Sequence, residues 1–216
     1  MLGNNVRYDG GNKNSNICCL QLSKHYQLVP ICPELESGLL VPRPPVELIQ
    51  HKNELRAIGR DNPSIDVTQR LNSFCDKKVP QLYKLSGFIL TPRSPSCGSG
   101  SVVIKSLTFH VLSKEGDGLF AHSLKAHFPR LPIIEEPSLF DDRVLILFQL
   151  RVTLYYLIQH DLLFPFLGKL HCDGARMLGD VFSVETNDKM LVVNKLLNGM
   201  KSEKAAVFLT QLRELQ

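Results

Sequence analysis

The sequence lacks several features that would place it in a common functional class. No apolar run is long enough to span a bilayer, and the nearest one, 144–163, is interrupted by Arg151, His160 and Asp161. The first residues, MLGNNVRYDGG, are polar and contain no apolar segment of the kind found in signal peptides. The chain also contains no GxxxxGK(S/T) phosphate loop, internal repeat or low-complexity tract. We therefore expect a cytoplasmic protein that does not associate with membranes.

Positively charged residues outnumber negatively charged ones only slightly. The 25 lysines and arginines stand against 21 aspartates and glutamates. This balance suits a small anionic ligand and does not indicate nucleic-acid binding. The 44% hydrophobic content is typical of a globular protein, and 216 residues suffice for one large domain or one domain with an appendage. We predict a small molecule as the binding partner and make no prediction of oligomeric state.

The chain contains six cysteines. In a reducing compartment they stay as thiols, so metal-binding or catalytic roles take precedence over disulfides. No special pattern surrounds Cys18, Cys19, Cys75 or Cys172. We interpret these four as small buried apolar residues.

The other two cysteines lie in unusual surroundings. In VPICPELESGLLVPRPP, residues 29–45, Cys32 stands between two prolines directly after an apolar run. Cys97 stands in SPSCG, which follows the apolar run 87–90. We predict buried strands at 26–32 and 87–90; as parallel neighbours they would bring the two thiols together at their carboxyl ends. The pattern favours a metal site, although it matches no zinc-finger spacing and offers only two clear ligands.

These patterns predict an α/β fold with a mostly parallel sheet flanked by helices, followed by a short α-helical C-terminal extension. We expect a catalytic α/β domain over 1–140 and a helical extension over 141–216. Apolar residues at helical spacing predict helices at 18–25, 66–85 with a break at Pro80, 117–128, 141–159, and from about residue 162 onward.

Several motifs give the chain a resemblance to a known family. NVRYDGGNK, VPICPE with GLLVPRPPVEL, DVT, and SPSCG occur in the order seen in the DUF523 family, which includes thiouracil desulfidases. The run GDGLFAHSLKAHFPRLPIIEEPSLFDD resembles longer members that carry a helical DUF1722 domain, and LLFPFLGKLHCDGARMLGD is loosely similar to the opening of that domain. The resemblance implies a desulfidase core with a partial DUF1722-like tail.

The resemblance also implies a 4Fe–4S cluster held by three cysteines, two of which would be Cys32 and Cys97. The third belongs to a C-x-L-G pattern that here ends at Leu2 and Gly3, so it would fall one position before Met1. Either the start is assigned too late or the product has lost a ligand; Cys18 or Cys19 as a substitute has no support in the family. Three thiolates leave one iron open, and iron suits the soft sulfur of a thiocarbonyl.

Replacement of that sulfur by water needs no net redox change but does need a carboxylate to move protons. Glu34, two residues after Cys32, is the predicted catalytic acid–base group; the alternative is a helix-capping or salt-bridged acid. Ser94 and Ser96 are predicted to orient the substrate or to hydrogen-bond to cluster sulfurs. The alternative for both serines is simple turn chemistry.

Three further residues are predicted to contact the substrate. Asp9 in RYDGG is a candidate polar contact, with an Asx-turn before Gly10 as the alternative. Arg7 and Arg43 would bind a phosphate if the substrate is a nucleotide, with ordinary ion pairs as the alternative.

The function that the sequence predicts is therefore hydrolase-type, iron–sulfur-dependent desulfidation of a 2- or 4-thiouracil base, nucleoside or nucleotide, with release of hydrosulfide. Two other functions remain open. One is a folded but inactive domain that lacks one cluster ligand, and the other is a zinc-binding module that uses Cys32 and Cys97.

Overall fold

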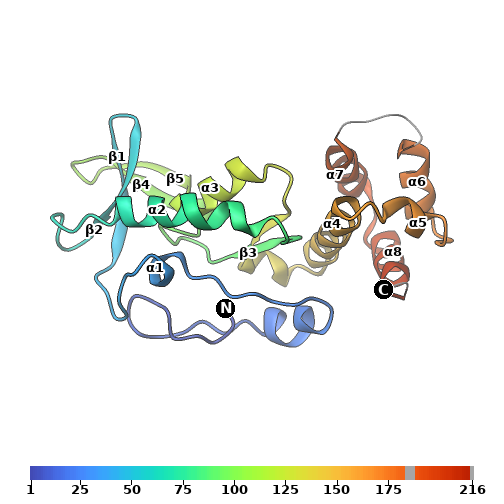
Figure 1. The fold of residues 1–216 in the computed structure, drawn as a ribbon, viewed down its shortest axis with the longest axis horizontal. Helices are drawn as coiled ribbons and strands as arrows, with labels where there is room; N and C mark the ends of the chain where they lie inside the picture. Colours follow the sequence, from blue (N-terminus) through green and yellow to red (C-terminus); the bar gives the residue numbers. More distant parts are fainter. Residues whose placement is uncertain (183–187, 215–216) are drawn as a thin grey trace. The chain divides into compact units, whose positions relative to one another are not determined.

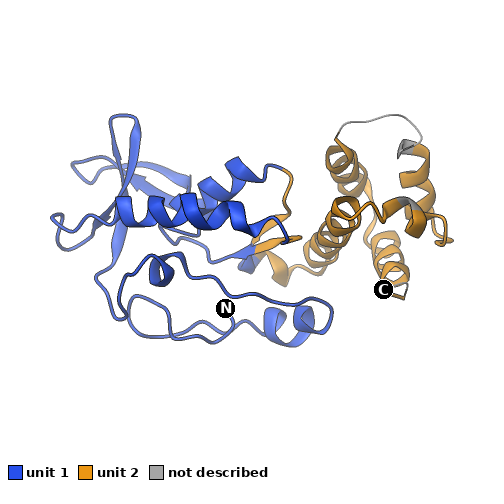
Figure 2. Ribbon diagram, viewed as in Figure 1, with its two compact units in different colours: residues 1–84, 89–129, 135–137 blue, residues 85–88, 130–134, 138–216 orange. Residues whose placement is uncertain are grey.

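The computed structural model describes residues 1–182 and 188–214, and the chain divides into two compact units (Figures 1 and 2). The first, which we call the sheet unit, comprises Met1–Lys84, Ile89–Pro129 and Glu135–Pro137. The second, the helical unit, comprises Leu85–Phe88, Arg130–Ile134 and the chain from Ser138 onward. All the residues predicted to act on the substrate or to bind the metal belong to the sheet unit.

The sheet unit is built on a four-stranded sheet with strand order β2-β1-β4-β5. The bounds of the strands are β1 Val46–His51, β2 Glu54–Gly59, β4 Ser99–Lys105 and β5 Val111–Asp117. Strands β1 and β4 pair in parallel, whereas β1 with β2 and β4 with β5 pair antiparallel. A second, two-stranded sheet pairs β3 (Phe88–Leu90) with β6 (Ile133–Glu135).

This arrangement confirms the predicted α/β class, with a central sheet flanked by helices and a helical C-terminal region. The expectation of a mostly parallel sheet was wrong. Lys52–Asn53 alone separate β1 from β2, and 106–110 separate β4 from β5. Connections this short join antiparallel neighbours, since a parallel pair needs a long crossover. Lys52 adopts a positive φ of 53°, as tight hairpin turns require.

Two helices, α2 (Thr68–Lys78) and α3 (Leu119–His127), pack against this sheet (Figure 1). The shared core contains residues from three strands, from both helices and from the connecting segments: Leu39, Leu48, Ala57, Val67, Leu71, Val102 and Leu119. Leu48 and Leu71 are completely buried, and burial of each such side chain is worth about 1.5–3 kcal/mol. The core therefore fixes α3 and the strands that surround the candidate site.

The DVT motif joins β2 to α2. The Asp66 carboxylate accepts hydrogen bonds from the backbone N–H and the hydroxyl of Thr68, at 2.9 and 2.5 Å. It also pairs with Arg56 on β2. The Thr68 hydroxyl in turn accepts from the backbone N–H of Ala57 at 2.9 Å. The role of this motif is thus to start α2 and to attach it to the sheet.

Other predicted elements of the sheet unit agree with the structure in part. Residues 18–25 are helical, as the turns Ile17–Gln21 and Leu22–Lys24. The helix predicted over 66–85 is α2 followed by a helical turn over Val79–Leu82, with the break at Pro80. The strand predicted at 26–32 was wrong: this segment has no strand partner among the described residues. Pro30 removes a backbone donor there, and Pro33 starts a helix instead of continuing the strand.

The helical unit contains five helices in the part of the chain that the structure describes. They are α4 Asp142–Gln159, α5 Leu163–Leu167, α6 Asp173–Phe182, α7 Lys189–Gly199 and α8 Ser202–Glu214. The Asp141 side chain caps α4 by accepting from the backbone N–H of Val144 at 3.1 Å. Leu150, Leu197 and Phe208 are completely buried. None of the helices in residues 1–182 and 188–214 has both the length and the apolar content that crossing a membrane requires.

Burial of Cys75 in α2 predicts a loss of stability in alkali. Its side chain is buried, and burial, with a smaller contribution from Asp76, raises the pKa of its thiol from 9.0 to about 11. The pKa of the Cys75 thiol is higher in the folded protein than in the unfolded chain. The protonated thiol therefore contributes its full stabilisation of the fold below pH 9, and this contribution is lost as the pH rises through 11. The loss from this thiol is about 3 kcal/mol, at roughly 1.36 kcal/mol for each unit of pKa difference.

The measurement is urea unfolding of the metal-free protein across this pH range, for the wild type and Cys75→Ala. The variant is expected to be less stable at neutral pH but to lose less stability in alkali, because other titrating groups contribute equally to both proteins. Parallel stability curves would show that Cys75 does not titrate in this way.

Candidate functional site

Cys32 and Glu34 are held by the short helix α1 (Pro33–Glu36). Cys32 occupies the position before this helix, and its backbone N–H donates to Glu36 Oε1 at 3.0 Å. The helix ends at Glu36, and Gly38, whose φ of 88° favours glycine, turns the chain sharply two residues later. Prolines and glycine therefore place the thiol and the carboxylate within one helical turn, as the sequence pattern suggested.

Glu34 is the centre of the candidate site. Its Oε1 accepts hydrogen bonds from the hydroxyls of Ser96 at 3.0 Å and Ser94 at 3.4 Å, although these serines lie 62 and 60 residues away along the chain. Its Oε2 accepts from Arg43 Nη2 at 2.6 Å. The structure thus brings together the three residues predicted to be catalytic, and it adds Arg43 to them.

The two serines also organise the turn that carries Cys97. The Ser94 hydroxyl accepts from the backbone N–H groups of Ser96 and Cys97 at 3.2 and 3.1 Å. The backbone N–H of Gly98 donates to the Ser94 carbonyl at 2.8 Å. The turn chemistry considered as an alternative is therefore present. It coexists with the contacts to Glu34, because a hydroxyl accepts and donates at the same time.

The start of helix α3 holds this turn from the other side. The Ser96 carbonyl accepts from the backbone N–H groups of Phe120 and Ala121 at 2.9 and 3.1 Å. A Cβ on Gly118 would lie 2.4 Å from the Ser96 carbonyl carbon and 2.8 Å from the Cys97 nitrogen. Only a glycine allows the two backbones to approach this closely. Gly118 is therefore a site residue that the sequence motifs did not indicate.

Gly118→Ala is expected to push the Cys97 turn away from α3. Because the obstructing atoms are backbone, we expect destabilisation of about 1–3 kcal/mol, as for an overpacked core, together with weaker iron binding. Thermal unfolding and iron content of the purified variant measure these two effects. The matched control is Gly179→Ala in α6, where an added Cβ meets nothing within 4 Å. Equal stability of the two variants would contradict the close approach at Gly118.

The loops that carry Cys32 and Cys97 meet at Glu34, through its contacts with Ser94 and Ser96. Burial raises the pKa of the Cys97 thiol well above 9.0, and the negative charges of Glu34 and Cys32 raise it further. Burial also raises the pKa of the Cys32 thiol. Two soft sulfur donors beside one carboxylate suit iron or another soft metal, and a bound metal would favour the thiolates. Among the described residues, no group of three or more His, Cys, Asp and Glu side chains is arranged to hold a metal ion. The donor set therefore fits two ligands of a cluster.

Cys18 and Cys19 have their own surroundings near the start of the chain. The Cys19 thiol donates to Asn14 Oδ1 at 3.0 Å and lies 3.7 Å from the Met1 carbonyl. Cys18 is buried. Burial of Cys18 agrees with its interpretation as a small buried apolar residue, whereas Cys19 is only half-buried and its thiol is hydrogen-bonded.

Arg7 and Asp9 form an exposed ion pair. Arg7 Nη2 lies 3.0 Å from Asp9 Oδ2, and its Nε donates to Asp9 Oδ1 at 3.2 Å. Asp9 Oδ1 also accepts from the backbone N–H of Gly11 at 3.0 Å, as in an Asx-type turn. The hydrogen bond from Arg7, followed by that from Gly11, lowers the pKa of Asp9. Both structural alternatives are thus observed, and contact of either side chain with a substrate remains a prediction.

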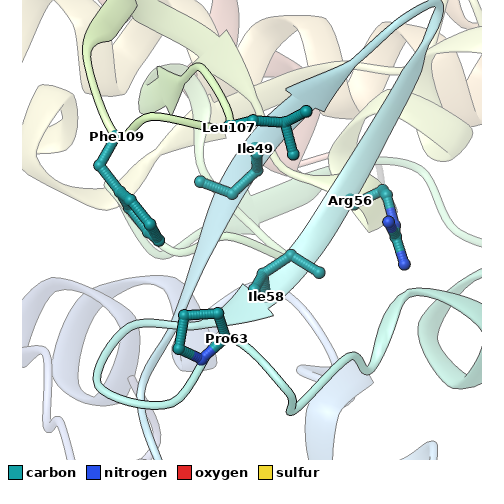
Figure 3. Close-up of a pocket in the computed structure, with 6 residues that line it drawn as sticks. All are labelled: Ile49, Arg56, Ile58, Pro63, Leu107 and Phe109. Atoms are coloured by element: carbon teal, nitrogen blue, oxygen red, sulfur yellow. The ribbon is translucent and has the colours of Figure 1, made fainter.

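A pocket of about 140 Å³ lies elsewhere on the sheet unit, over β1, β2 and the loop between β4 and β5 (Figure 3). It is lined by Ile49, Arg56, Ile58, Pro63, Leu107 and Phe109. Its lining is mainly apolar, and its one charged residue, Arg56, is paired with Asp66. None of these six residues belongs to the predicted site, so this pocket is separate from the cysteine loops.

Comparison with known proteins adds two findings. The family model described as 2-thiouracil desulfurase matches residues 1–136, which include every predicted site residue. A solved structure described as a 4Fe–4S-dependent thiouracil desulfidase, TudS (DUF523Vcz), is 29% identical with a TM-score of 0.50. The match covers 65% of this chain and 88% of that chain. No curated protein matches this chain.

Proposed function

Because the chain belongs to the 2-thiouracil desulfurase family, we propose that it removes sulfur from a thiolated pyrimidine with the aid of an iron–sulfur cluster. The observation that carries the proposal is the contact of Glu34 with Ser94 and Ser96, which brings the loops of Cys32 and Cys97 together around one carboxylate. The solved relative is 4Fe–4S-dependent by its description, and cysteine thiols are the donor type that such a cluster needs.

Cys32 and Cys97 would hold the cluster. By resemblance, the third cysteine would stand one position before Met1. When bound through three cysteines, a cluster supplies an open, soft Lewis-acidic iron for the sulfur of a thiocarbonyl.

Glu34 is proposed as the group that moves protons. Desulfidation replaces C=S by C=O: one water supplies the oxygen, one of its protons leaves with the sulfur as hydrosulfide, and the other must be taken up. An ionised carboxylate offers about four acceptor positions. Ser94, Ser96 and Arg43 fill three of them, which leaves one position on Oε2 for a water molecule.

Ser94 and Ser96 are proposed to fix the direction of that carboxylate. Both hydroxyl hydrogens point to Oε1, so rotation of the Glu34 side chain would break two hydrogen bonds. Their oxygens retain acceptor capacity for a ring N–H of the substrate. Arg7 and Asp9 are proposed as an exposed polar contact, and the substrate is proposed to be a 2- or 4-thiouracil base, nucleoside or nucleotide.

Anaerobic purification followed by iron and sulfide analysis tests the proposal, first on this chain and then on a form with Met-Cys added before Met1. Each form is incubated with thiolated uracil bases, nucleosides and nucleotides, and hydrosulfide and the oxygen-containing pyrimidine are measured in parallel. We expect equal amounts of both products from an iron-loaded form. An iron-loaded protein that releases no hydrosulfide from any of these compounds would refute the proposal. If neither form binds iron, the inactive-domain interpretation is favoured.

A further inference from the structure

The side chain of Arg43 is more buried than is expected of an arginine that binds phosphate from a surface loop. Its side chain is only 9% exposed. Nη2 donates both to Glu34 Oε2 at 2.6 Å and to the Val6 carbonyl at 3.0 Å. The second guanidinium nitrogen, Nη1, donates to the Leu40 carbonyl at 3.4 Å. This guanidinium is therefore engaged on both of its terminal nitrogens within the protein.

The same residue connects three separate segments of the site. Its backbone N–H donates to the Tyr8 carbonyl at 2.8 Å, so main chain and side chain both hold the 6–8 turn. The Val6 carbonyl that receives Nη2 lies 3.9 Å from the Cys32 thiol. One arginine thus ties the 6–8 turn to α1, on the side of Glu34 opposite the two serines.

We infer that Arg43 is a positioning residue, which holds the Glu34 carboxylate and the Val6 carbonyl beside Cys32, and that it does not bind a substrate phosphate. This inference rests on the proposed function, because the carboxylate it positions is the proposed proton-moving group. With Ser94 and Ser96 on Oε1 and Arg43 on Oε2, the carboxylate is fixed at both oxygens. A planar guanidinium that bridges two acceptors is poorly replaced by lysine, which carries a point charge.

The test compares Arg43→Gln, Arg43→Lys and Glu34→Gln, alone and combined, with Arg60→Gln as the matched control. Arg60 pairs with Glu47 through a 3.0 Å contact and is half exposed, away from the cysteine loops. Each iron-loaded variant is assayed with a thiolated uracil base and with the matching nucleoside monophosphate. Iron content and thermal unfolding are measured beside kcat and KM.

A misplaced carboxylate lowers turnover, so Arg43→Gln is expected to lower kcat about 10- to 100-fold for base and nucleotide alike, with KM changed less than about threefold. Arg43→Lys should recover part of this loss. Arg43→Gln should lower kcat little further once Glu34→Gln is present, because both act through one carboxylate. Arg60→Gln should match the wild type.

Any of three results would overturn the inference. One is a rise in KM confined to the nucleotide, which would assign Arg43 to the phosphate. The others are unchanged kcat in Arg43→Gln and fully additive losses in the double variant. An iron-loaded parent protein that releases no hydrosulfide is a different outcome, since it refutes the proposed function itself.

Discussion

Replacing Glu34 by glutamine is expected to lower kcat by about 100- to 10,000-fold, the range typical for loss of a general acid–base group. Glutamine keeps the size of the side chain and can still accept from Ser96, but it cannot take a proton from the attacking water. The glutamine is uncharged and can turn its amide nitrogen toward Arg43. Either effect weakens the contact that Arg43 makes with Glu34 at 2.6 Å. Binding of the substrate does not depend on this proton transfer, so KM should change far less than kcat.

The matched control is Glu36→Gln on the same short helix. Glu36 accepts from the backbone N–H of Cys32 at 3.0 Å and lies 3.3 Å from Lys78, and glutamine retains an acceptor for the first contact. We expect this variant to keep its iron and nearly all of its activity. Steady-state rates of hydrosulfide release, normalised to bound iron, compare the two variants. Similar rates in Glu34→Gln and Glu36→Gln would remove Glu34 from the proton-transfer role.

Several elements of the fold could be predicted because their signals are local. The helical spacing of apolar residues predicted α2, α3 and α4, and Pro80 predicted the end of α2. The β1–β2 and β4–β5 hairpins were missed. Their strands contain charged and polar residues such as Glu47, Lys105 and Lys114, and three of their glycines interrupt the strand pattern. The pairing of β1 with β4, which lie far apart along the chain, depends on the packed core, which no short stretch of sequence specifies.

The candidate site was predictable in its residue types but not in its connections. Proline and glycine around Cys32 and Cys97 indicated fixed thiols, and the structure brings their two loops together at Glu34. The reason given was wrong, since 26–32 is not a strand. Contact between the two loops depends instead on Glu34 and the serines, 60 and 62 residues apart. No local signal showed that Arg43 would pair with Glu34, because VPRPP indicates only irregular backbone.

The helical tail lies beyond the part of the chain that the family model matches. The family match ends at residue 136, before α4 begins. A DUF1722-like origin of the helical unit, and a domain boundary at 140, therefore remain predictions. The buried leucines of α4, α7 and α8 show that this part of the chain forms a core of its own.

Cys32→Ser and Cys97→Ser are each expected to abolish cluster binding and, with it, all measurable desulfidation. A hydroxyl has a far higher pKa than a thiol and is a hard donor, so it does not replace a thiolate on iron. Both variants should fold, because serine is close in size to cysteine and neither thiol belongs to the main apolar core of the sheet unit. Without metal, the Cys97→Ser protein should be at least as stable in alkali as the wild type. The pKa of the wild-type Cys97 thiol is raised, so ionisation of this thiol destabilises the folded protein.

Cys19→Ser and Cys172→Ser are the matched controls for this pair. Cys19 contacts Asn14 and the Met1 carbonyl, and Cys172 precedes α6 in the helical unit. Each control should keep the iron and sulfide content of the wild type, measured after anaerobic reconstitution along with visible absorption. Loss of iron in Cys19→Ser would instead make that residue the third ligand. Retention of iron in both Cys32→Ser and Cys97→Ser would contradict a cluster at the two loops.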